Sequence, residues 1–122
     1  MLITLYGIPN CDTIKKARKW LDAKGVEYQF HDYRKDGITA ELVNEFFQAL
    51  GWQNVINKRG TTYRQLSPQQ KENLNETTAL PLLLDQPAMI KRPILRIEKL
   101  LYVGFSTDDY ATLFPSLQGQ QG

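Results

Sequence analysis

The fold is decided near the N-terminus, by the stretch LITLYGIPNCDTIKKARKWL at residues 2–21. Residues 2–6 are a short aliphatic and aromatic run, which predicts a buried β-strand. The sequence GIPN at residues 7–10 predicts a turn. Apolar residues then recur at helical spacing, with basic residues between them, up to Gly25. This stretch therefore predicts a strand, a turn and a helix, with Cys11 where the turn meets the helix.

The remainder of the chain supplies further strands. Residues 26–33 alternate between apolar and polar side chains, which predicts a strand parallel to the first. Residues 94–97 and 100–103 predict a β-hairpin. Ser106 has the pattern of an N-cap and predicts a final helix. Together these elements predict an α/β fold with a mixed sheet of about four strands.

A helical segment separates the second predicted strand from the hairpin. Thr39 is predicted to cap its first helix, and Ser67 is predicted to begin a second helix with a capping box. A third short helix is predicted over residues 78–86, with Pro81 in its early turns. Residues 57–62 are predicted to form a loop.

Size and charge exclude several classes of protein. The chain has 122 residues, of which 42% are hydrophobic, as in an ordinary globular domain. A net charge of +2 is too small to predict direct nucleic-acid binding. The longest strongly apolar stretch, residues 79–84, is far shorter than the roughly 20 residues that cross a bilayer. With no visible secretory signal, we expect a cytoplasmic protein without a membrane partner.

The domain organisation follows from this length and from the order of the elements. We expect one domain over residues 1–117, because separate cores need on the order of 100 residues each. The helical segment is an insertion at about residues 36–90. The polar residues 118–122 are expected to be a flexible tail.

Cys11 is the only cysteine, and this restricts the chemistry available to the chain. A single thiol excludes an intrachain disulfide and a metal site built from several thiolates. His31 is the only histidine, so a His-rich metal site and a Ser-His-Asp triad are both disfavoured. We expect no metal site, and we expect His31 to be a surface or hydrogen-bonded side chain rather than a general base.

Cys11 falls at the predicted start of the first helix. Unpaired backbone N–H groups and the helix dipole favour an anion there, so the pKa of a thiol is lowered and the thiolate becomes a nucleophile. Asp12 opposes this effect, and Lys15 and Lys16 partly offset Asp12. A buried structural cysteine is the alternative interpretation. Position alone leaves both interpretations open.

Two arginines are candidates for binding an anion. Arg59 lies in a loop rich in glycine and threonine, and Arg92 precedes Pro93 at the entry to a strand. A guanidinium binds carboxylates and oxyanions through paired hydrogen bonds. For each arginine, a solvated surface charge is the alternative. The cations predicted to be ordinary surface residues are Lys58, Arg64, Lys91 and Arg96.

These motifs together resemble the arsenate reductase (ArsC) family with its Spx and YffB relatives. The resemblance rests on YGIPNCDT at residues 6–13, KKAR at residues 15–18, Lys58-Arg59, and QPAMIKRPI at residues 86–94, and it covers about residues 2–115. It is closest to the YffB-like branch, whose members are described as glutathione-dependent thiol reductases. The resemblance implies a thioredoxin-like fold with a helical insertion.

The resemblance also implies roles for particular residues. Cys11 would be the nucleophile of a monothiol reductase that uses glutathione as co-substrate, with no bound cofactor. Its substrate would be a small oxidised thiol or an oxyanion, and Pro93 would be a cis proline beside the thiol. The residues implied in substrate or anion binding are Asn10, Thr13, Arg59, Arg92 and Pro93.

Two departures from the family pattern define the alternative functions. Gly7 stands where arsenate reductases carry a histidine, and residues 103–105 lack their third arginine, so arsenate reduction is a second hypothesis. Residues 103–105 and Asp108-Asp109 resemble Spx regulators, but Ile14 occupies the second position of their C-x-x-C switch. A regulator that binds RNA polymerase is therefore a third hypothesis.

Overall fold

A four-stranded mixed sheet forms the centre of the protein. The computed structural model describes residues 2–114. Its strands are β1 (Ile3–Gly7), β2 (Gln29–Asp32), β3 (Ile94–Ile97) and β4 (Leu100–Val103), in the spatial order β2-β1-β3-β4. β1 pairs parallel with β2 and antiparallel with β3, and β3 pairs antiparallel with β4. The predicted four-stranded α/β sheet and its C-terminal hairpin are confirmed.

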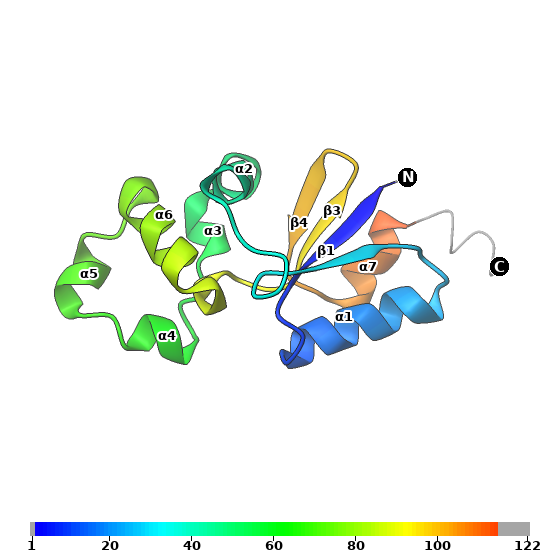
Figure 1. Ribbon diagram of the computed structural model, residues 1–122. Helices are drawn as coiled ribbons and strands as arrows, with labels where there is room; N and C mark the ends of the chain where they lie inside the picture. The colour runs from blue at the N-terminus through cyan, green and yellow to red at the C-terminus, as the bar shows by residue number, and fades with distance from the viewer. Residues whose placement is uncertain (1, 115–122) are drawn as a thin grey trace.

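Helices join these strands and cover both faces of the sheet (Figure 1). α1 (Asp12–Ala23) connects β1 to β2, and α7 (Thr107–Leu113) follows β4. Between β2 and β3 lie α2 (Ala40–Leu50), α3 (Trp52–Val55), α4 (Thr61–Arg64), α5 (Pro68–Glu72), α6 (Glu76–Asp85) and the 3-10 turn η1 (Pro87–Met89). This is the predicted helical insertion. None of the helices in residues 2–114 is long and apolar enough to cross a membrane.

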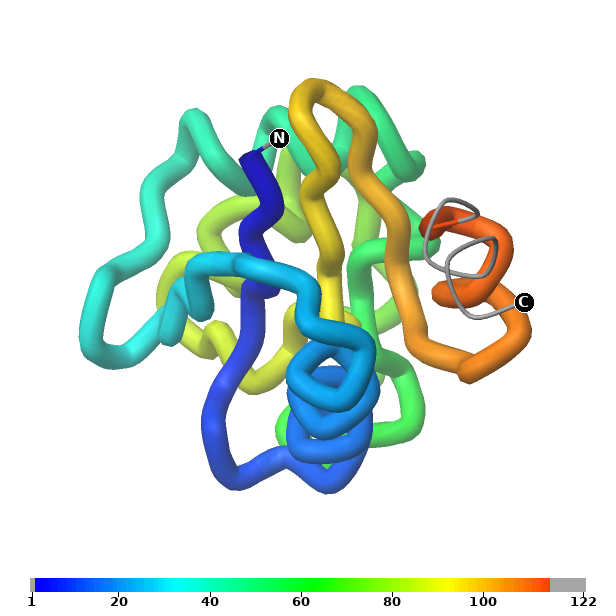
Figure 2. The backbone as a smooth tube through the Cα atoms, turned by 90° about the vertical axis from the view of Figure 1, so that its right-hand side faces the viewer, coloured from blue at the N-terminus to red at the C-terminus, as the bar shows by residue number. Residues whose placement is uncertain are grey.

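The two faces of the sheet carry separate hydrophobic cores, because successive side chains of a strand point in opposite directions. On one face, Leu5 of β1 packs with Leu21 of α1 and Tyr110 of α7. On the other face, Tyr6 packs with the helices of the insertion, including Phe46 of α2 and Leu83 of α6. Figure 2 shows the strands running between these helical layers. The alternation along β1 therefore divides the protein into three layers.

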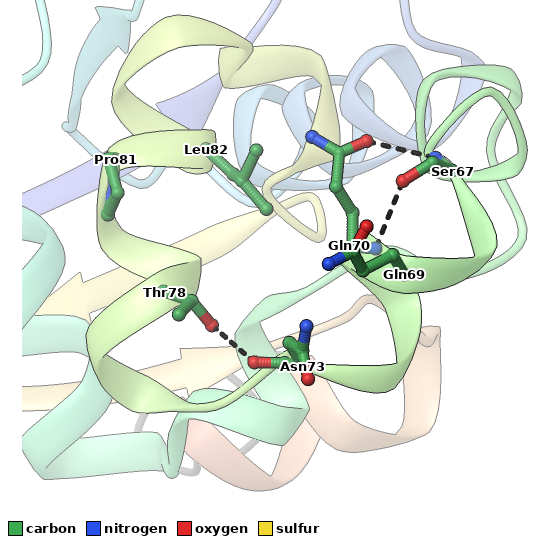
Figure 3. A pocket seen from close by; sticks show the side chains of 7 residues that line it. All are labelled: Ser67, Gln69, Gln70, Asn73, Thr78, Pro81 and Leu82. Atoms are coloured by element: carbon green, nitrogen blue, oxygen red, sulfur yellow. Dashed lines mark hydrogen bonds between the residues drawn. The ribbon is translucent and has the colours of Figure 1, made fainter.

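The predicted helix caps are confirmed at the starts of three helices. Thr39 accepts a hydrogen bond from the Leu42 N–H at α2, and Ser106 caps α7 in the same way. At α5, the Ser67 hydroxyl accepts from the Gln70 N–H, and the Gln70 side chain accepts from the Ser67 N–H (Figure 3). These bonds satisfy N–H groups that have no partner within the helix.

Several boundaries differ from the prediction. The second strand covers only Gln29–Asp32, because β1 offers partners only from Thr4 to Gly7. The predicted loop at residues 57–62 is wrong in part, since its last residues begin α4. The third predicted helix begins two residues earlier, because Asn75 and Thr78 form a capping box, so Pro81 lies inside α6. The predicted tail at residues 118–122 lies outside the described residues.

Arg96 is not the surface residue that was predicted. Its Nε donates to the Tyr6 hydroxyl at 2.9 Å, and its Nη1 lies 2.8 Å from a carboxylate oxygen of Glu45 on α2. Burial lowers the pKa of Arg96, but its bonds to Glu45 and Tyr6 outweigh burial and raise it. Arg96 occupies a strand position that faces the insertion, so the charge is accommodated by a tyrosine and a helix carboxylate.

Replacing Arg96 tests whether its bond to Tyr6 stabilises the fold. We expect Arg96→Met to lower the free energy of unfolding by about 1–3 kcal/mol, because the Tyr6 hydroxyl loses its donor in a largely buried setting. Urea denaturation measures the change. Tyr6→Phe combined with Arg96→Met should cost less than the sum of the two single changes. Strictly additive losses would contradict the coupling.

Candidate active site

Cys11 is the N-cap residue of α1, where the turn after β1 meets the helix. Its N–H donates to the Ile8 carbonyl at 3.3 Å, and its own carbonyl accepts from the Lys15 N–H at 3.0 Å. These bonds fix the backbone on both sides of the thiol. The side chain is free and partly exposed, so a ligand can reach the sulfur, whereas a structural cysteine would be buried.

The surroundings of Cys11 favour its ionised form. Burial raises the pKa of the thiol, but the Ile14 N–H, the Arg92 guanidinium and the Thr13 N–H together lower the pKa below its ordinary value. The thiol makes no capping hydrogen bond of regular geometry. The two N–H groups therefore act on the sulfur mainly as aligned dipoles at the helix start.

Gly7 allows β1 to approach the first turn of α1 closely. A Cβ atom at this position would lie 2.9 Å from Ile14 Cγ1, and closer still to Ile14 Cδ1. Ile14 itself is fully buried. Any larger residue at position 7 would push Ile14 away, and the N–H group of Ile14 is one of those that stabilise the thiolate.

Arg92 is the cation that the fold brings to the sulfur. Its Nη1 donates to the Ala88 carbonyl of η1 at 2.7 Å, which anchors the side chain. Its buried Nε has no hydrogen-bond partner within residues 2–114. The guanidinium also acts on Cys11, both as a hydrogen-bond donor and through its charge. The Arg92-Pro93 peptide bond is cis, as predicted.

Tyr33 lies near this arginine and was not singled out from the sequence. The residue is 2% exposed, and its hydroxyl has no partner among the described residues. Burial raises the pKa of Tyr33, and the charge of Arg92 acts in the opposite direction. No sequence pattern pointed to this position, because Tyr33 is the last residue of the alternating stretch and follows β2.

The other predicted site residues lie in different surroundings. Thr13 belongs to the first turn of α1 and contributes its N–H, whereas Asn10 is exposed in the preceding turn. Within residues 2–114, Arg59 is not among the groups that shift the pKa of Cys11. Arg59 instead lines a pocket with Lys58 and Lys91, two cations predicted to be plain surface residues.

His31 is hydrogen-bonded, as predicted, and lies away from the proposed nucleophile. Its Nε2 is 2.8 Å from the Gly37 carbonyl, and its ring packs 5.1 Å from the ring of Tyr6. Across residues 2–114 there is no group of three His, Cys, Asp or Glu side chains that could hold a metal ion.

A second hollow lies between α5 and α6, and Cys11 is not among the residues that line it (Figure 3). Its walls are neutral polar side chains together with Pro81 and Leu82. The polar groups are bonded to one another, as where the Thr78 hydroxyl donates to the Asn73 carbonyl at 2.9 Å. The residues that line this hollow include no thiol and no charged side chain.

Comparison with known structures finds close relatives. A solved structure described as the YffB protein is 49% identical, with a TM-score of 0.86 over 90% of this chain and 96% of that chain. An arsenate reductase (ArsC) related protein from Brucella melitensis is 44% identical, with a TM-score of 0.78 over 93% of this chain and 95% of that chain.

Sequence comparison agrees with the structural comparison. An uncharacterised protein of Haemophilus influenzae is 43% identical over 113 residues, which are 93% of this chain and 99% of that protein. The global transcriptional regulator Spx of Lactiplantibacillus plantarum is 26% identical over 117 residues, 93% of this chain and 87% of the regulator. The sequence profile of the ArsC family matches residues 6–113. The chain belongs to the ArsC family.

Proposed function

We propose that this protein is a glutathione-dependent monothiol reductase with Cys11 as its nucleophile. The observation that carries the proposal is a partly exposed thiol at the start of α1, beside the N–H groups of that helix and the Arg92 guanidinium, which lower its pKa. Such a thiol is ionised over more of the physiological pH range than a free cysteine, and the thiolate is the form that attacks a disulfide. A cytoplasmic location, where glutathione is abundant, fits this chemistry.

In the first step, the Cys11 thiolate attacks one sulfur of a disulfide substrate. A new bond forms between Cys11 and that sulfur, the substrate S–S bond breaks, and the other sulfur leaves as a thiolate. The guanidinium of Arg92 and the N–H groups of Thr13 and Ile14 lie around the reacting sulfur and stabilise negative charge there. Arg59 is the second proposed anion-binding residue. Asn10 and Pro93 are proposed to contact the substrate.

In the second step, an external thiol must release Cys11, because the chain has no second cysteine. A glutathione thiolate attacks the mixed disulfide and a second one completes the exchange. Overall, one disulfide becomes two thiols while two glutathione molecules become glutathione disulfide. The Cys11 thiolate is regenerated, and electrons balance without a bound cofactor.

Regulation is a second candidate function, favoured by the likeness to Spx over 93% of the chain. A regulator that binds RNA polymerase would do so without needing Cys11. Capture of purified polymerase by both the wild-type protein and Cys11→Ser would support this function, and failure of both to bind would remove it.

Arsenate reduction is a third candidate, favoured by the relative described as arsenate reductase related and by the Arg92 guanidinium beside Cys11. The tight packing of Gly7 against Ile14 leaves no space for a histidine at position 7. Turnover of arsenate in an assay coupled to glutathione and glutaredoxin, lost in Arg92→Ala, would support this candidate. Absence of turnover would eliminate it.

Removing the charge of Arg92 tests whether this residue lowers the pKa of Cys11. Because Arg92 lowers the pKa of Cys11 in two ways, as hydrogen-bond donor and as charge, Arg92→Met should raise that pKa. A thiolate exists above its pKa, so the pH curve of the alkylation rate should move to higher pH in the variant. The wild-type midpoint should lie below the value of about 8.5 for free cysteine.

The exposed Lys99→Met substitution serves as the control for this curve, since Lys99 lies in the turn between β3 and β4. Its alkylation curve should superimpose on that of the wild type. If the alkylation curve of Arg92→Met also superimposes on that of the wild type, Arg92 does not stabilise the thiolate.

Mass spectrometry after incubation with glutathione disulfide tests the reductase itself. The wild-type protein should gain one glutathione, and reduced glutathione should remove it again. Cys11→Ser should gain none while keeping the wild-type circular dichroism spectrum, because the Cys11 side chain is not part of either core. A wild-type protein that stays unmodified would contradict the proposed function.

A further inference from the structure

A basic pocket of about 330 Å³ lies between the segment that precedes α4 and the residue that precedes Arg92. Ile56, which lines this pocket, forms an isolated antiparallel bridge with Ile90. Two backbone hydrogen bonds support the bridge, from the Asn57 N–H to the Met89 carbonyl at 2.8 Å and from the Lys91 N–H to the Val55 carbonyl at 2.7 Å. The pocket is therefore built on fixed backbone and not on a free loop.

The walls of this pocket carry positive charge and amide groups. Lys58, Arg59 and Lys91 line it together with the side chains of Gln53 and Asn57. No carboxylate is among the lining residues. Within residues 2–114, none of the three cations forms a salt bridge, since the ion pair found there joins Arg96 to Glu45. Three unneutralised cations around one hollow favour an anionic ligand.

Two consecutive residues of one segment connect the pocket with Cys11. Lys91 lines the pocket, and the next residue, Arg92, reaches Cys11. Figure 1 shows α4, which follows the Lys58-Arg59 segment, toward the same lower side of the molecule as the N-terminal end of α1. One segment of the chain therefore contributes both to the pocket and to the surroundings of the sulfur.

We propose that this pocket, lined by Lys58, Arg59 and Lys91, binds the carboxylates of a peptide thiol or disulfide while its sulfur reacts at Cys11. The inference rests on the proposed reductase function and specifies the class of substrate. Glutathione has carboxylates at both ends of its chain and a sulfur between them. The pocket therefore makes the enzyme selective for anionic peptide disulfides over neutral ones.

The kinetic test compares an anionic with a neutral disulfide. The double variant Lys58→Met and Lys91→Met removes two charges and keeps the length of the side chains. We expect its rate of mixed-disulfide formation with glutathione disulfide to fall about tenfold, equivalent to about 1.4 kcal/mol. Its rate with uncharged hydroxyethyl disulfide should be unchanged. Lys99→Met is the control and should match the wild type with both reagents.

Equal losses with both disulfides, or no loss with either, would overturn the inference while leaving the reductase function intact. A separate binding measurement does not depend on redox chemistry. S-methylglutathione cannot react with a thiol, so its binding to Cys11→Ser can be followed by amide chemical shifts. We expect shifts at Asn57 and Arg59 that disappear in the double lysine variant. Absence of those shifts would overturn the pocket assignment even if Cys11 proves reactive.

Discussion

The attraction between an ionised Cys11 sulfur and the donors around it is the interaction on which the proposed function depends. Burial by itself would keep this thiol neutral. The N–H groups of Ile14 and Thr13 and the guanidinium of Arg92 reverse that effect. Each of these donors is positioned by a different local feature: the close packing of Gly7 on Ile14, the start of α1, and the bond from Arg92 to the Ala88 carbonyl.

The pairing of β1 with β3 explains how residues 81 positions apart meet. Tyr6 pairs with Ile94, so the turn that follows β1 lies beside the segment that precedes β3. That arrangement places Cys11 next to Arg92. The insertion contributes to the same region. Its η1 supplies the carbonyl that anchors Arg92, and Ile56, which is bridged to Ile90, lines the basic pocket. The sheet thus positions Cys11, the proposed nucleophile, and the insertion helps to position Arg92 and the cations of the basic pocket.

Local patterns predicted most of the fold. The hairpin at residues 94–103 and the caps at Thr39 and Ser67 follow from short-range rules, so they could be found without knowing any tertiary contact. The position of Cys11 at a helix start was predictable for the same reason. The long-range contacts were not: Arg96 looked like any strand arginine until its partners Tyr6 and Glu45 were known.

The candidate site shows the same division between local and long-range information. Arg59 and Arg92 could be named from family resemblance, but sequence could not show that Arg92 acts directly on the Cys11 thiol. Nor could it show that Lys58 and Lys91, separated by the whole α4–α6 segment, line one pocket with Arg59. The most direct measurement of the central claim is an NMR pH titration of the Thr13 and Ile14 amide protons. Both should shift with one midpoint, below that of an ordinary thiol, and neither should shift in Cys11→Ser. Amide protons that do not respond, or that respond with the midpoint of a free cysteine, would contradict the account.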